Sequence, residues 1–267
     1  MIINQYIKFL FISFFFMFMS SAQANSQSKL NVFYPGEEIE YEVSFMGIKL
    51  GNITITSIEE VDLKGKKVYS AKAEMKSNPG IPFVSLNAVF ESLMEKNLTH
   101  SHQFKGSTKQ GDNVWITEKF DMKYPEKHIV YELWQDNKLD KTYKIEFDKK
   151  VNDGCSLFFF ARQFTDLGRT VKVPTLINAA LSYTNLNFHG RAEKTDIKAV
   201  KYPIKTLFFD GRADWEGVYG LKGYFKGWFS DDDARVPIKA EMNVYVGNVD
   251  IELIRWKRGN WQPPKAN

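Results

Sequence analysis

The stretch WEGVYGLKGYFKGWFSDDDARVPIKAEMNVYVGNVDIELIRW, residues 215–256, decides the fold class. Its first half intersperses glycines with aromatic residues. Glycine inside a strand marks a bend, a bulge or a close approach, or faces an aromatic ring on the next strand. After an aspartate-rich turn the polarity alternates again, and Gly247-Asn248 predicts a tight hairpin turn before a last strand from Val249 to Ile254. The stretch therefore predicts an antiparallel β-sheet.

The same two-residue period recurs along the rest of the chain. In the run from Glu38 to Phe45, Ile39 and Tyr41 begin an apolar face that alternates with glutamates, as in a half-buried strand. The repeated amphipathic helices and fully apolar strands of a parallel α/β fold are absent from the sequence. We therefore predict a mainly β protein, an antiparallel meander that forms a curved sheet, a sandwich or a partly closed barrel.

One short apolar helix is expected at about residues 154–165. Asp153 can cap its N-terminus. A broad apolar face follows from Leu157, Phe158, Phe160, Ala161 and Phe164. Because such a helix must be covered, we expect it to plug the open end of the curved sheet.

The N-terminus has the three-part layout of a secretory signal peptide. Lys8 precedes an apolar run (residues 9–19) with Ser13 as its one polar residue, and the small residues Ala22 and Ala24 precede a cleavage site before Asn25. The run is shorter than the roughly 20 apolar residues that a membrane-spanning helix needs. We expect residues 1–24 to be removed and the mature protein to reside in the periplasm of a Gram-negative bacterium, with association with the outer membrane as the alternative.

The remaining chain is expected to fold as a single β-rich domain over residues 31–261, followed by a loose tail over residues 262–267. The formal charge of +4 falls by one without Lys8. A charge this small, together with export, argues against nucleic acid as a partner. The single cysteine, Cys155, excludes an intrachain disulfide.

Aromatic residues are the candidates for the wall of a binding pocket, and core packing is the alternative role for each of them. The candidates are Trp215, Tyr219, Tyr224, Trp228 and Phe158. For Asp231, Asp233 and Arg235 we predict a structural turn with an ion pair. A calcium loop is disfavoured because Arg235 stands where an EF-hand needs an oxygen ligand.

No metal site, cofactor or catalytic residue is expected from the sequence. His100 and His102 project to one side of a strand, but a metal site needs three or four ligands with supporting partners, so we interpret them as surface histidines. Cys155 is expected to be a buried structural thiol. The chain contains no serine-hydrolase elbow, zinc-protease helix motif, phosphate loop or dinucleotide fingerprint.

Three stretches resemble the domain-of-unknown-function 3108 family. They are YFKGWFSDDDARVPIKAE from Tyr224 with the following Gly247-Asn248 turn, GEEIEYEVSFMGIKLG from Gly36, and the helix from Asp153 to Arg162. The resemblance implies an exported, mostly β bacterial protein with no assigned activity. It also implies a proline after Asp153, where this chain has Gly154. This departure from the family pattern argues against a shared catalytic role for the next residue, Cys155.

Together these features favour a binding or carrier module for an apolar or amphiphilic envelope component, a lipid or a glycan, because curved sheets and barrels can enclose small ligands. The alternatives are a structural protein that binds another envelope protein, an integral outer-membrane barrel, and an enzyme that acts on envelope polymers through dispersed acids. The sequence leaves the oligomeric state open.

Overall fold

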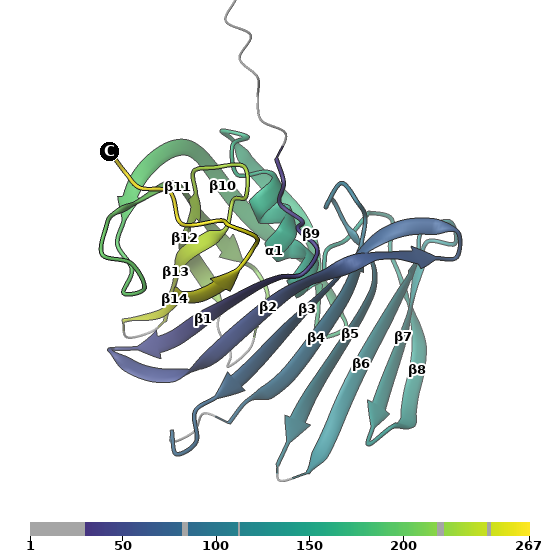
Figure 1. Ribbon diagram of the computed structural model, residues 1–267. Coiled ribbons are helices and arrows are strands. Elements are labelled where there is room, and N and C mark those ends of the chain that lie inside the picture. The colour runs from purple at the N-terminus through teal and green to yellow at the C-terminus, as the bar shows by residue number, and fades with distance from the viewer. Residues whose placement is uncertain (1–29, 82–84, 112, 218–221, 245–246) are drawn as a thin grey trace, which may run out of the picture.

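The structure, a computed structural model, describes residues 30–81, 85–111, 113–217, 222–244 and 247–267. These residues form one antiparallel sheet of 14 strands and one helix (Figure 1). The elements are β1 (Glu37–Phe45), β2 (Ile48–Leu63), β3 (Lys66–Ser77), β4 (Asn87–Met94), β5 (Ser101–Gln110), β6 (Val114–Lys123), β7 (His128–Gln135), β8 (Lys138–Glu146), α1 (Gly154–Gln163), β9 (Thr170–Ile177), β10 (Ala180–Thr195), β11 (Ile204–Ala213), β12 (Gly223–Ser230), β13 (Pro237–Asn243) and β14 (Asn248–Lys257). The predicted mainly β meander is confirmed.

The two ends of the chain meet at the centre of the sheet. The strand order is β8-β7-β6-β5-β4-β3-β2-β1-β14-β13-β12-β11-β10-β9, so β1 pairs with β14 and the mid-chain strands β8 and β9 form the edges. The sheet curves strongly, and α1 connects its edges from within the curve (Figure 1). Over the described residues β8 and β9 share no ladder, so the sheet stays open.

The segment before α1 narrows the opening between the two edges. The backbone amide of Ser101 in β5 donates to the carbonyl of Val151 (2.9 Å), and the amide of Asn152 donates to the carbonyl of Pro174 in β9 (2.9 Å). The carbonyl of Asn152 in turn accepts from the amide of Leu176 (2.8 Å). This segment therefore links β5 to β9 across the gap.

A capping box starts the helix at the predicted place. One carboxylate oxygen of Asp153 accepts from the amides of Cys155 (2.7 Å) and Ser156 (2.8 Å), and the hydroxyl of Ser156 accepts from the amide of Asp153 (3.0 Å). These bonds satisfy amides that a helix start otherwise leaves without partners. The helix ends at Gln163, slightly before the predicted end.

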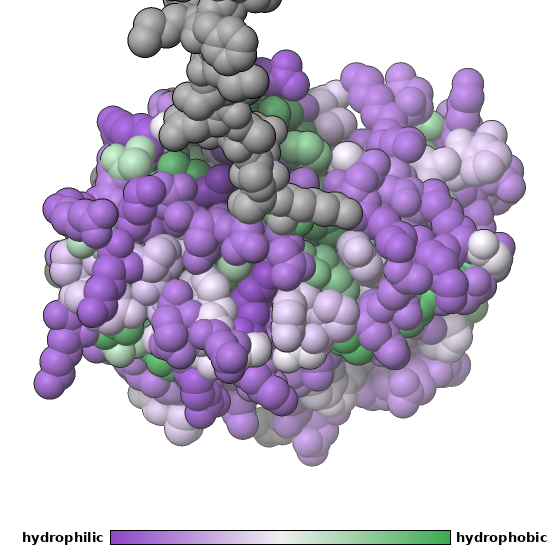
Figure 2. Space-filling model, turned by 45° about the horizontal axis from the view of Figure 1, so that its top comes forward, coloured by the Kyte–Doolittle hydropathy of each residue, from purple (hydrophilic) through white to green (hydrophobic). Residues whose placement is uncertain are grey.

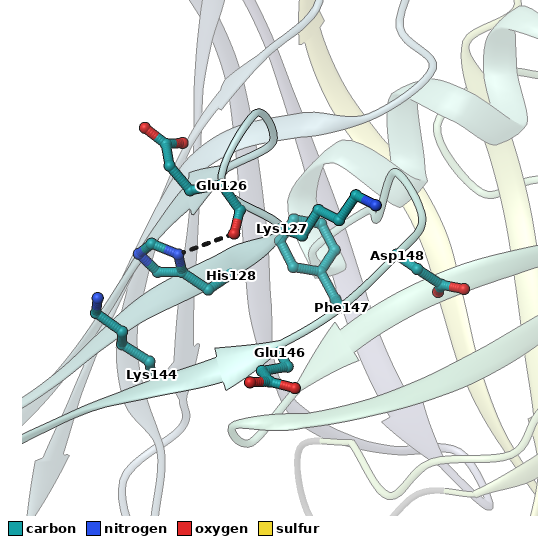
Figure 3. Close-up of a pocket in the computed structure, with 7 residues that line it drawn as sticks. All are labelled: Glu126, Lys127, His128, Lys144, Glu146, Phe147 and Asp148. Atoms are coloured by element: carbon teal, nitrogen blue, oxygen red, sulfur yellow. Dashed lines mark hydrogen bonds between the residues drawn. The ribbon is translucent and has the colours of Figure 1, made fainter.

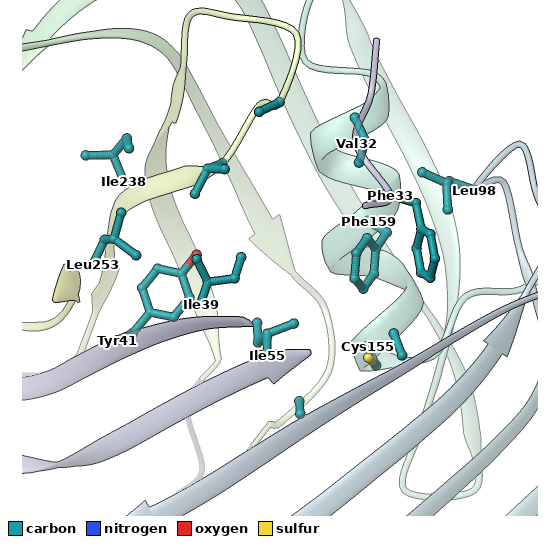
Figure 4. Packing of buried hydrophobic residues seen from close by; sticks show 14 of the residues in the cluster. Val32, Phe33, Ile39, Tyr41, Ile55, Leu98, Cys155, Phe159, Ile238 and Leu253 are labelled. Carbon is teal, nitrogen blue, oxygen red and sulfur yellow. The ribbon is translucent and has the colours of Figure 1, made fainter. Parts of the chain in front are cut away.

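The inner face of α1 is buried beneath the sheet and the N-terminal segment. Phe159 is fully buried and lies beside Phe33, with ring centroids 5.8 Å apart (Figure 4). The ring of Phe33 stacks on Tyr69 of β3 at 3.9 Å, and Cys155 joins the same cluster. The core thus ties the helix to the middle of the sheet.

A buried charge network also holds α1 in place. Arg162 and Glu37 are both fully buried, and the guanidinium donates to the two carboxylate oxygens at 2.6 and 3.1 Å. Arg258 donates to the same carboxylate and to the carbonyl of Asn31. Burial alone would raise the pKa of Glu37, but the two guanidinium groups outweigh it and hold that pKa below its ordinary value.

Two reciprocal pairs of glycine and phenylalanine set the spacing of β11 and β12. Gly211 is opposite Phe225, and Phe209 is opposite Gly227. A Cβ at Gly211 would lie 2.5 Å from Cζ of Phe225, and one at Gly227 would lie 2.5 Å from Cε1 of Phe209. Each ring therefore covers the glycine across the ladder, which is one of the roles expected for these glycines.

Two features differ from the sequence-based predictions, and a third prediction falls on residues that the structure does not describe. β12 begins only at Gly223, so Trp215 precedes the strand. The segment 262–267, expected to be loose, is bound: the carbonyl of Pro264 accepts from the amide of Lys205 (2.8 Å), and the amide of Ala266 donates to Pro203 (2.8 Å). The predicted signal peptide, residues 1–24, lies outside the described residues. None of the described helices is long and apolar enough to cross a membrane.

Candidate functional site

An apolar cavity of about 480 Å³ lies between α1 and the inner face of the sheet. Its charged lining residues are few, namely Lys76, Glu118 and Lys239. The helix contributes Cys155, Phe158 and Ala161, and strands from both halves of the sheet contribute aromatic side chains, which are Tyr41, Phe90, Phe104, Phe120, Phe209, Phe225 and Phe229. A ligand inside would meet hydrocarbon and aromatic surface almost throughout.

The structure places two of the five aromatic candidates in the cavity wall. Phe158 lines it from α1, and Trp215 lines it from the loop after β11, where its indole nitrogen donates to the hydroxyl of Thr184 (2.7 Å). The hydrogen bond to Thr184 satisfies the one polar group of the Trp215 indole and leaves its apolar surface for the cavity. Tyr219 lies outside the described residues.

Tyr224 and Trp228 do not line the cavity, which corrects the expectation for them. Successive side chains of a strand point to opposite faces. Since Phe225 and Phe229 line the cavity, Tyr224 and Trp228 lie on the outer face of β12. Tyr224 is 61% exposed, and the indole nitrogen of Trp228 donates to a carboxylate oxygen of Glu193 (2.6 Å).

Cys155 lines the cavity but has no sign of activation. Its side chain is buried, and burial raises the pKa of the thiol well above its ordinary value. A thiolate nucleophile requires the opposite shift. The side chain of Cys155 therefore contributes packing surface at the start of α1.

The aspartate-rich turn is a structural turn held by two different carboxylates. Asp231 pairs with the guanidinium of Arg235 (3.1 Å) and with Lys205 (2.8 Å). Asp232 accepts from the amides of Ala234 (3.1 Å) and Arg235 (3.2 Å). Asp233 contributes its carbonyl, which accepts from the amide of Asn31 (2.9 Å). Asp232 was the turn residue that the sequence did not single out.

The two neighbouring histidines are not at the surface. His100 is 1% exposed, and the side chain of His102 is 11% exposed. Their Nε2 atoms lie 3.7 and 3.2 Å from one carboxylate oxygen of Glu95, which follows β4. Burial lowers the pKa of His100 to about 4, so its ring is neutral at pH 7. Glu95 could not be predicted as a neighbour of the two histidines, because only the turn between β4 and β5 brings its carboxylate to the rings.

A second, polar depression of about 670 Å³ lies beside β7 and β8 (Figure 3). Its lining residues are Glu126, Lys127, His128, Lys144, Glu146, Phe147 and Asp148. Nδ1 of His128 lies 3.3 Å from the backbone carbonyl of Glu126. Most of these side chains are exposed and their charges are mixed, so the depression is a solvated surface groove.

Comparisons with known proteins identify the family and support the fold. A comparison with curated proteins found no match. The crystal structure of a beta-barrel-like protein of domain of unknown function DUF1849 from Brucella abortus is similar, with a TM-score of 0.56 and 8% sequence identity over 86% of this chain and 100% of that chain. At this identity the similarity shows the fold alone. The family described as "Protein of unknown function (DUF3108)" matches residues 40–254, so this chain belongs to the DUF3108 family.

Proposed function

We propose that this protein binds an apolar or amphiphilic component of the cell envelope, a lipid, in the cavity between α1 and the sheet. The observation that carries this proposal is the nearly continuous apolar lining of a space of about 480 Å³. Ligand cavities usually have volumes of about 300–1,000 Å³ and a mostly apolar wall with a few polar groups. Glu118 lies on the same face of β6 as Phe120, and its carboxylate, which accepts from the hydroxyl of Tyr131 (2.9 Å), is suited to the polar end of an amphiphile.

A lipid fits this wall better than a glycan. The hydroxyl groups of a sugar lose their hydrogen bonds to water on entry, and each unpaired group costs on the order of 1–3 kcal/mol. The aromatic and aliphatic side chains of the wall offer few replacements. Acyl chains lose no hydrogen bonds and gain burial of apolar area.

A carrier role in the periplasm is part of the proposal. Its support is the N-terminal sequence, in which Lys8, an apolar run and small residues follow the order of a secretory signal. On the face shown in Figure 2 most side chains are hydrophilic, and apolar ones appear only in small separate groups. A hydrophilic surface and an apolar cavity are the properties that a protein needs to carry a lipid through water.

Filling the cavity is expected to weaken lipid binding. Ala240 of β13 lines the cavity, and its ladder neighbours are Gly227 and Ile251. In Ala240→Phe the added ring occupies ligand space, so we expect the affinity for a fluorescent fatty acid to fall by about tenfold or more, a loss of roughly 1.4 kcal/mol. The measurement is a fluorescence titration of delipidated protein.

The matched control is Tyr224→Ala, which removes an aromatic ring from the outer face of β12 and should leave the affinity unchanged. Native mass spectrometry of the gently purified protein should also show bound lipid. A wild-type protein that neither carries lipid nor takes up the fatty acid would refute the proposal and favour an interaction protein. Equal affinities for wild type and a folded Ala240→Phe variant would place the ligand outside the cavity.

A further inference from the structure

Three side chains at the turn between β4 and β5 converge outside the cavity. One ligand atom each from Glu95, His100 and His102 lies within 4.8 Å of the others. None of the three residues belongs to the cavity wall. The ring of Tyr124 packs edge-on against both imidazoles, at centroid distances of 5.1 and 5.9 Å. The two rings are thus held in place by packing.

Hydrogen bonds determine which nitrogen of His100 carries its proton. The side-chain carbonyl of Asn97 accepts from the hydroxyl of Thr99 (2.6 Å) and from the amide of the same residue (3.3 Å). The hydroxyl has only one proton to donate. Its oxygen, 2.8 Å from Nδ1 of His100, therefore accepts from an Nδ1–H group, and in this tautomer the lone pair of the ring is on Nε2.

The surroundings of Nε2 suit a cation. Nε2 of His100 lies 3.7 Å from a carboxylate oxygen of Glu95, and two lone-pair donors at that distance repel each other unless positive charge lies near them. Lys66 supplies such charge by pairing with the same oxygen. Because the side chain of Lys66 is 52% exposed, it can swing into solvent at little cost.

We propose that Glu95, His100 and His102 bind a divalent transition-metal ion, with zinc as the best match. Zinc takes imidazole nitrogens and carboxylate oxygens in a tetrahedral arrangement, and these three residues leave a fourth position for water. The bond from Thr99 to Nδ1 of His100 is the kind of supporting contact that orients a metal-bound histidine. On binding, His102 carries its proton on Nδ1 and turns the lone pair of Nε2 to the metal.

A zinc titration tests the site in the full mature chain after treatment with EDTA. Calorimetry should show one equivalent of zinc bound, and the melting temperature should rise with zinc. His102→Gln should weaken zinc binding by at least about tenfold. Lys66→Met removes the competing cation and should strengthen binding, an effect that a purely structural role of this cluster would not produce.

The matched control is His128→Gln, because His128 lies in the polar groove beside β8 and makes no contact with this cluster. It should leave the affinity and stoichiometry for zinc unchanged. Glu95→Gln serves as a second variant where His102→Gln fails to fold. No zinc binding by the wild type, or binding that persists in His102→Gln and Glu95→Gln, would overturn the proposal. Both results are independent of lipid binding.

Discussion

Replacing Arg162 with methionine is expected to lower the free energy of unfolding by roughly 3–5 kcal/mol. Arg162 is fully buried and donates to both carboxylate oxygens of Glu37 and to the carbonyls of Ala234 (3.0 Å) and Arg235 (3.2 Å). The methionine fills part of the volume but donates to none of these acceptors. A buried carboxylate then keeps only Arg258 as a charged partner, which is the main cause of the loss.

Equilibrium unfolding in urea measures this loss, and Arg191→Met is its matched control. Arg191 also pairs with a glutamate, Glu193, but its side chain is 59% exposed. Exposed ion pairs contribute about 0–1 kcal/mol, so the control should stay close to wild type. If both variants unfold at the same urea concentration, the buried network contributes no more than a surface pair.

The pH dependence of the same variant has a defined sign. The pKa of Glu37 is below its ordinary value in the folded protein, because the two arginines outweigh the effect of burial. Its ion pairs therefore stabilise the fold fully above the unfolded pKa of about 4.5 and lose that effect as the pH falls through the folded pKa. We expect the stability difference between wild type and Arg162→Met to narrow in acid.

Glu37 was not among the residues predicted to point inward, although the two-residue period of β1 extends to it. It lies two residues before Ile39 and four before Tyr41, so it shares their face of β1, and both of those side chains are buried. Its partner could not be predicted, since Arg162 stands 125 positions away along the chain and a sequence shows only local periodicity. The N-cap at Asp153 was predictable because all of its contacts with the helix lie within three residues.

The candidate cavity was predictable only in outline. The two-residue period of β12 separates Tyr224 and Trp228 from Phe225 and Phe229, but both faces are aromatic, and only the position of α1 shows which face is inside. For the cluster around His100 the sequence showed the two histidines but not the third ligand. Glu95 meets them through the turn after β4, whose geometry depends on the pairing of β4 with β5.

The substitution Gly211→Ala is expected to cost about 2–3 kcal/mol, a large effect for one methyl group. The new Cβ would lie 2.3 Å from the backbone oxygen of Asn185 in β10 and 2.5 Å from the ring of Phe225. The backbone oxygen can move only by opening the ladder between β10 and β11. Because the ring of Phe225 lines the cavity, its displacement changes the cavity wall, and we expect weaker binding of the fluorescent fatty acid as well as earlier unfolding in urea.

The same chemical change at Gly154 separates crowding from the general effect of adding a methyl group. A Cβ there would meet only Cδ1 of Ile177, at an ordinary distance of 3.6 Å, and Gly154 is the first residue of α1. Alanine favours the helix and restricts the unfolded chain, so Gly154→Ala should be neutral or stabilise by up to about 1 kcal/mol. Equal stabilities for the two variants would mean that β10, β11 and β12 adjust their spacing freely. The rings over Gly211 and Gly227 would then pack against these glycines without fixing the curvature of the cavity wall.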